Sequence, residues 1–166
     1  MGARSRQLSS MDDDTRLTLI AESVLYCQRV QSMGMPSSCY TKALREPVYF
    51  LWEARGNPKH KAAKFRSTAA AGLRFGKREM VYDHAVPFRY LQNDLLALDP
   101  VDPASLRQVL ERFGVAALIT TDEDSRLKAL GFQHTMPQDW DGLDVLARYR
   151  AAGVELEENP TWWAKR

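Results

Sequence analysis

The uninterrupted apolar runs of this 166-residue chain are short, and this feature most constrains its fold. The clearest run is Val115 to Ile119, which lies between Gly114 and a polar Thr-Thr pair. Five apolar residues cannot cross a bilayer, because a spanning helix needs about 20. A short apolar run between a glycine and a polar cap is instead typical of a buried strand. The sequence therefore predicts no membrane-spanning segment and at least one buried strand.

Helical periodicity dominates the rest of the chain. Leu17, Ile20, Val24 and Cys27 recur at helical spacing, which predicts a helix over about 13–33 that ends before Gly34 and Pro36. Short β-prone segments predict a strand over 79–83, and another near 154–156. Further helices are expected from Pro47, over 67–71, over 88–98, after an Asp102 cap with Pro103 in the first turn, after a Thr121 cap, and from Asp141 to Ala152.

These elements predict an α+β (or α/β) protein, mostly helical, with a small sheet of two or three strands. The length suits one domain with a sizeable core, expected over 13–156, with a flexible N-terminal tail over 1–12 and a C-terminal tail over 157–166. The N-terminus has basic residues without a following apolar stretch, and the two cysteines lack a CxxC spacing. Both features favour a cytoplasmic protein without a disulfide framework.

Charge is distributed unevenly along the chain, although the formal net charge is only +2. Residues 122–158 are predominantly acidic, whereas residues 55–78 contain no Asp or Glu. The second segment, with Phe65 and Phe75 interleaved, could neutralise phosphates and stack on bases, which predicts DNA or RNA binding. Two alternatives are a solvated helix face and a surface covered by the acidic half. The eight cationic candidates are Arg55, Lys59, Lys61, Lys64, Arg66, Arg74, Lys77 and Arg78.

Asp83 and His84 are the strongest candidates for chemistry. They end a predicted strand directly after the basic segment, in the string Val81-Tyr-Asp-His-Ala-Val-Pro87. A histidine can act as a general base while a neighbouring carboxylate binds a divalent ion, and such a pair can hydrolyse phosphodiesters. The structural alternative is a histidine that donates to a backbone carbonyl in a turn, with Asp83 paired to a cation.

The string Asp83-His84-Ala85-Val86-Pro87 resembles the first motif of the HNH, or His-Me-finger, nucleases, which has the form D-H-x-x-P. The resemblance implies a nuclease that uses Mg²⁺ or another divalent metal. It assigns Asp83 as a metal ligand and His84 as the general base. The family places a further ligand downstream, for which His134 and Asn93 are the candidates.

Other polar and aromatic features have simpler interpretations. Thr121 with Asp124 is interpreted as a helix-capping box rather than a Mg²⁺ cluster. Trp162 and Trp163, near the C-terminus, are candidates for contact with a protein partner. Two functional hypotheses follow. One is a nucleic-acid-binding, metal-dependent nuclease, and the other is a non-catalytic accessory or inhibitory protein that binds a macromolecule through its basic or its acidic face.

Overall fold

The computed structural model describes residues 8–165, and the chain divides into two compact units. Unit 1 combines residues up to 57 with 88–114, and unit 2 combines 58–87 with residues from 115 onward. The predicted α+β class is confirmed, although the sheet has four strands rather than two or three. The prediction of one domain over 13–156 stays a prediction.

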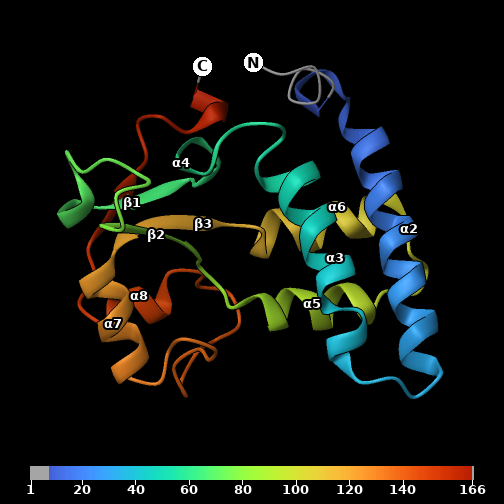
Figure 1. Ribbon diagram of the computed structural model, residues 1–166. Helices are drawn as coiled ribbons and strands as arrows, with labels where there is room; N and C mark the ends of the chain where they lie inside the picture. Colours follow the sequence, from blue (N-terminus) through green and yellow to red (C-terminus); the bar gives the residue numbers. More distant parts are fainter. Residues whose placement is uncertain (1–7, 166) are drawn as a thin grey trace. The chain divides into compact units, whose positions relative to one another are not determined.

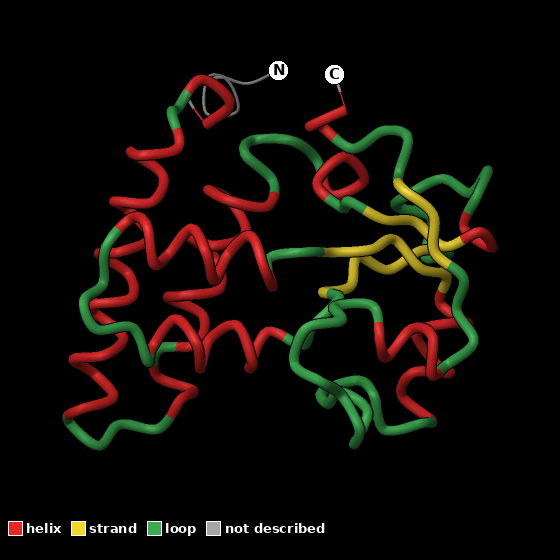
Figure 2. The backbone as a smooth tube through the Cα atoms, turned by 180° about the vertical axis from the view of Figure 1, so that it is seen from behind, coloured by secondary structure: helices red, strands yellow, loops and turns green. Residues whose placement is uncertain are grey.

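Unit 1 is helical, and α2 is its longest element (Figure 2). The predicted apolar positions of α2 are buried, which confirms the expected helix. Asp12 caps it by accepting a hydrogen bond from the Thr15 amide at 2.8 Å. Asp102 caps α6 in the same way, with 2.9 Å bonds from the amides of Ala104 and Ser105. The elements are α2 (Asp13–Ser32), η1 (Ser37–Cys39), α3 (Thr41–Pro47), η2 (Val48–Glu53), α5 (Phe88–Leu96) and α6 (Pro103–Phe113).

The prediction that Pro47 begins a helix is wrong. Helix α3 begins at Thr41 and Pro47 ends it, after which Val48–Glu53 continues as a π-helix. Proline lacks an N–H and cannot continue the α-helical hydrogen-bond ladder, so the ladder changes at this residue. The Ala54 amide then reaches back five residues to the Tyr49 carbonyl, at 2.8 Å.

Unit 2 is built on a four-stranded sheet with the order β2-β3-β1-β4 (Figure 1). Strand β1 is parallel to β3, and the other two pairs are antiparallel. The predicted strands at 79–83 and 115–120 are confirmed as β2 and β3. The elements are α4 (Lys59–Ala62), β1 (Phe65–Ser67), η3 (Thr68–Ala70), β2 (Met80–His84), β3 (Ala116–Thr120), α7 (Thr121–Ala129), α8 (Ala147–Ala151), β4 (Leu156–Glu158) and η4 (Trp163–Lys165).

The two faces of this sheet differ in their neighbours. One face, here called the helix face, packs Ala117 and Ile119 against Leu127 of α7 and Tyr149 of α8. Figure 1 shows both helices on the same side of the strands. The other, here called the basic face, packs Met80, Tyr82 and Leu118 against Ala63 and Phe75. Paired residues across a sheet share a face. Arg66, which pairs with Leu118, therefore belongs to the basic face.

Three predictions in unit 2 are wrong. The helix expected over 67–71 is only a 3₁₀ helix over Thr68–Ala70, because residues 65–67 form β1 and pair with strands distant in sequence. Helix α7 is capped by Thr120 and Glu123, one residue before the expected pair. Asp141 begins a turn, since its Oδ1 accepts from the amides of Leu143 and Asp144, and α8 starts only at Ala147.

The segment expected as a C-terminal tail is largely ordered. Strand β4 covers Leu156–Glu158, close to the third strand expected near 154–156. Asn159 follows it and is only 1% exposed. Its Nδ2 donates to the carbonyls of His60 and Ala63, both at 2.8 Å, which fixes this segment beside α4. Within residues 8–165, none of the helices is long and apolar enough to span a bilayer.

Candidate nucleic-acid interface

Asp83 and His84 lie side by side in β2, but their side chains project from opposite faces of the sheet. Successive residues of a strand alternate between faces. Asp83 contacts Tyr149 and Arg148 of α8 on the helix face. His84 contacts the ring of Tyr82 on the basic face, with 5.7 Å between ring centroids. The strand therefore separates the two groups that the sequence pattern placed in one site.

Asp83 belongs to a buried ionic network. Its Oδ2 accepts hydrogen bonds from the Tyr149 hydroxyl, at 2.7 Å, and from the Arg148 guanidinium. Arg148 is 1% exposed and also donates to the backbone carbonyls of His84, Ala85 and Phe132. A buried charge is tolerated when it is paired and hydrogen-bonded, as both members are here. Asp83 thus ties β2 to α8, which matches the structural alternative of a paired carboxylate.

Burial and charge together shift the pKa of the two α8 side chains. Burial raises the pKa of Tyr149 well above its ordinary value, and the negative charge of Asp83 raises it further. For Arg148, burial lowers the pKa, but interactions with Tyr149 and Asp83 outweigh burial and the net pKa is raised. Tyr149 therefore stays a neutral donor and Arg148 stays charged near neutral pH.

His84 lies on the same face as part of the basic segment. The Lys59 ammonium is 6.0 Å from the centroid of the Tyr82 ring, which in turn contacts His84. His84 is half-buried, as is Tyr82. One cation, one phenol and one imidazole therefore lie close together on the basic face.

The cationic candidates fall into several groups. Three cations belong to the basic face. Lys59 contacts Tyr82, Arg66 is paired with Leu118 in the sheet, and Arg74 lines a cavity on this face. Arg55 belongs to unit 1, where it pairs with Asp13 and stacks on Trp52 at 4.7 Å, so it is not part of the basic face. The Lys64 ammonium lies 5.4 Å from the centroid of the Phe65 ring, which packs on the helix face. The remaining three belong to unit 2, and no described contact assigns them to a face: Lys61, Lys77 and Arg78.

Arg66 also shows where the acidic half of the chain meets the basic segment. Its Nε and Nη2 donate to one carboxylate oxygen of Glu157, on the adjacent strand β4. The sequence alternative of an acidic surface folding against the cations is therefore realised at this residue. Among the described residues, Arg74, Lys77 and Arg78 form no ion pair with an acid.

A cavity of about 280 Å³ opens on the basic face. It combines two arginines, Arg66 and Arg74, with the rings of His60 and Phe75, whose centroids are 6.5 Å apart. Its apolar floor comes from the sheet and the loop before β2. The remaining lining residues are Leu73, Met80, Leu118, Asn159 and Thr161.

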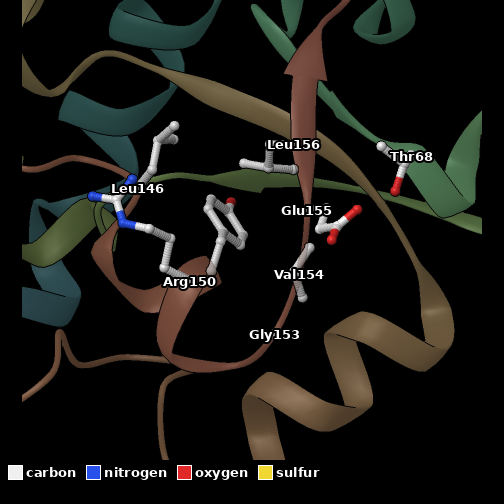
Figure 3. Close-up of a pocket in the computed structure, with 8 residues that line it drawn as sticks. Thr68, Leu146, Arg150, Gly153, Val154, Glu155 and Leu156 are labelled. Carbon is white, nitrogen blue, oxygen red and sulfur yellow. The ribbon is translucent and has the colours of Figure 1, made fainter.

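A larger cavity, of about 680 Å³, lies beside α8 and β4. Figure 3 shows Leu146 and Arg150 on one side of it, and Val154, Glu155 and Leu156 on the other. Arg150 and Glu155 both line it, so this cavity carries charges of both signs. Mixed charge and an apolar lining do not favour a polyanion, and the basic face is the better candidate interface.

The metal site implied by the sequence resemblance does not fit these side chains. Asp83 uses its carboxylate for Arg148 and Tyr149, on the face opposite His84. His134 lies exposed in the loop after α7, and Asn93 is exposed within α5 of unit 1. Across residues 8–165, no three His, Cys, Asp or Glu side chains lie close enough to hold an ion.

The two C-terminal tryptophans are part of unit 2 rather than a free tail. The rings of Trp162 and Trp163 contact each other at 5.8 Å, and the Lys64 ammonium lies 5.5 Å from the Trp162 ring. Both rings are half-buried. Their exposed parts add aromatic surface next to a lysine, and a role in binding a protein partner stays a prediction.

Sequence reasoning missed two residues on which these surfaces depend. Arg148 holds Asp83, and Asn159 fixes the wall of the smaller cavity through the carbonyl of His60. Asn159-Pro160 is a turn signal that marks where β4 ends. The sequence carries no comparable signal for Arg148.

The chain matches no protein-family model, no curated protein and no solved structure.

Proposed function

We propose that the protein binds nucleic acid through the basic face of unit 2. One observation carries the proposal: cations and aromatic rings from 59–82 gather on a single face of the sheet. Lys59 lies over Tyr82, and Arg66 and Arg74 line a cavity with Phe75. Cations neutralise phosphates, and exposed rings stack on bases. Nothing in this arrangement favours DNA over RNA.

The experiment is a salt titration of binding to labelled DNA and RNA oligonucleotides. Each phosphate neutralised by a cation releases counterions, so log affinity falls linearly with log salt. Removing both Lys59 and Arg74, as K59A/R74A, should weaken binding and reduce the salt slope by about 1 per residue. Lys128→Ala is the matched control, because Lys128 is an exposed lysine of α7 that pairs with Asp124. An unchanged slope in the double variant would contradict the proposal.

A metal-dependent nuclease of the HNH group is the second candidate function. It is favoured by His84, which reaches the basic face beside Tyr82 and Lys59. A divalent ion in such a site would need ligands other than Asp83, whose carboxylate is held by Arg148. The assay is cleavage of DNA and RNA with Mg²⁺ or Mn²⁺. Cleavage that His84→Ala abolishes while binding persists supports this function, and no cleavage by the wild type leaves binding alone.

The non-catalytic hypothesis of a protein-binding accessory factor makes a different prediction in the same titration. Wild-type protein would then bind neither DNA nor RNA at low salt. The acidic residues of 122–158 would be the surface to examine next, since they could contact a basic protein partner.

A further inference from the structure

We infer that the cavity on the basic face accepts one unstacked nucleotide, so that this face binds single-stranded nucleic acid in preference to duplex. The cavity is here called the nucleotide pocket and is defined by His60, Arg66, Arg74 and Phe75. The inference rests on the proposed function and names its substrate class. A base inside a duplex is stacked and paired, whereas a base in a single strand can leave the stack at low cost.

The size of the nucleotide pocket suits one nucleotide. Its volume of about 280 Å³ lies just below the range of roughly 300–1,000 Å³ for drug-sized ligands. A duplex cannot enter a hollow of this size, and one base with its sugar is the natural guest. The pocket opens beside the exposed side chains of Leu73 and Arg74, in the loop that precedes β2.

Two kinds of group in the pocket match the two parts of a nucleotide. Phe75 is half-buried and lines the pocket, so part of its ring is open to a stacking base, while the ring also packs against Leu118 and Met80. Arg74 is exposed and Arg66 shares its charge with Glu157, which leaves a positive balance for a phosphate. Base stacking on an aromatic ring and a cation for the backbone are the recurring parts of single-strand sites.

The polar lining of the pocket predicts little discrimination between bases. Both Nδ2 hydrogens of Asn159 bond the carbonyls of His60 and Ala63, and its Oδ1 accepts from the amide and hydroxyl of Thr161. These groups hold the wall of the pocket and are not available to read a base edge. Recognition then depends on the ring and the charges, which accept any base.

The test compares the affinity for a single-stranded oligonucleotide with that for the matching duplex, by fluorescence anisotropy at fixed salt. Phe75→Leu keeps an apolar side chain against Met80 and Leu118 but removes the ring. We expect single-strand affinity to fall about 10-fold and duplex affinity to stay unchanged. Phe75→Tyr retains a ring and should restore single-strand binding. Phe132→Ala is the control, because Phe132 is a half-buried phenylalanine of unit 2 that packs on the helix face.

The possible outcomes separate this inference from the proposed function. Equal wild-type affinity for single strand and duplex, or equal single-strand affinity of wild type and Phe75→Leu, would overturn the nucleotide pocket but not nucleic-acid binding. Binding of neither oligonucleotide by the wild type would overturn both. Thermal melting of each variant shows whether the fold is retained, and the comparison of single strand with duplex in the wild-type protein still tests the inference if Phe75→Leu does not fold.

Discussion

Each unit contains an aspartate that is held by arginine, and the two sites differ mainly in burial. In unit 1, Asp13 is 34% exposed and pairs with Arg55 and Arg107, both of which stack on Trp52. In unit 2, Asp83 is 20% exposed and pairs with Arg148, which is only 1% exposed. The residue types are the same, but Arg148 is buried, whereas Arg55 and Arg107 are 19% and 36% exposed. Breaking the pair in unit 2 therefore leaves polar groups that water cannot reach, and breaking the pairs in unit 1 does not. Burial, more than the number of ion pairs, therefore decides how much an Asp–Arg pair contributes to the free energy of unfolding.

The largest expected effect comes from removing the buried arginine. Arg148→Ala leaves three backbone carbonyls without this donor and Asp83 without its counter-charge, although the Tyr149 hydroxyl still donates to the carboxylate, and should lower the free energy of unfolding by about 3–5 kcal/mol. Urea denaturation followed by circular dichroism measures it. Arg150→Ala is the matched control, because Arg150 lies two residues away, is 63% exposed and should cost less than about 1 kcal/mol. If both variants lost a similar free energy of unfolding, burial would not explain the contribution of Arg148.

A smaller effect is expected from one hydroxyl of the same network. Tyr149→Phe keeps the buried ring but removes the hydrogen bond to Asp83, and should lower the free energy of unfolding by about 1–2 kcal/mol. Tyr26→Phe provides the control, since Tyr26 is 53% exposed on α2. Urea denaturation measures both variants. Equal losses in the free energy of unfolding would contradict the role of the Tyr149 hydroxyl.

Removing the half-exposed aspartate should cost less again. Asp13→Ala breaks the pairs with Arg55 and Arg107 in a solvated site, and should lower the free energy of unfolding by about 1 kcal/mol. Because salt screens exposed charges, this loss should shrink when denaturation is repeated at about 1 M NaCl. A loss that is independent of salt would show that the site behaves as a buried one.

The smallest effect is a pH dependence from the same carboxyl. Burial raises the pKa of Asp13, but hydrogen bonds and charge from Arg55 and Arg107 outweigh it, and the net pKa lies below its ordinary value. The pKa of an aspartate in the unfolded chain is about 3.9. The stabilisation is therefore complete above that pH and is lost as the pH falls through the lower folded pKa. Asp13→Asn should flatten the stability profile below about pH 4, and a profile parallel to that of the wild type would contradict the assignment.

Sequence reasoning predicted the elements whose signals are local. Helix α2 has its apolar stripe and Asp12 cap, α6 has Asp102 and Pro103, and β3 is a buried run after Gly114. The misplaced elements depend on contacts distant in sequence. Strand β1 has only three residues and forms because β3 and β4, which both lie far along the chain, pair with it. No local pattern predicts such a partner.

The candidate site was predictable in its charges but not in its geometry. The acid-free basic segment predicted the lysines and arginines that the basic face presents, together with Phe75. Asp83 and His84 were predicted as one site because they are adjacent in sequence. Adjacent residues of a strand point to opposite faces, and the pattern alone did not show that Arg148 would occupy the carboxylate.

The alternation of β2 makes this short strand intolerant of a change in length. Inserting or deleting a single residue before Asp83 would exchange the two faces, so that an imidazole would meet the buried guanidinium and a carboxylate would enter the cationic surface. Either half of that exchange is unfavourable, since one strips Arg148 of its counter-charge and the other introduces repulsion for a phosphate. One backbone register thus decides both which group meets Arg148 and which group faces the cations of the basic face.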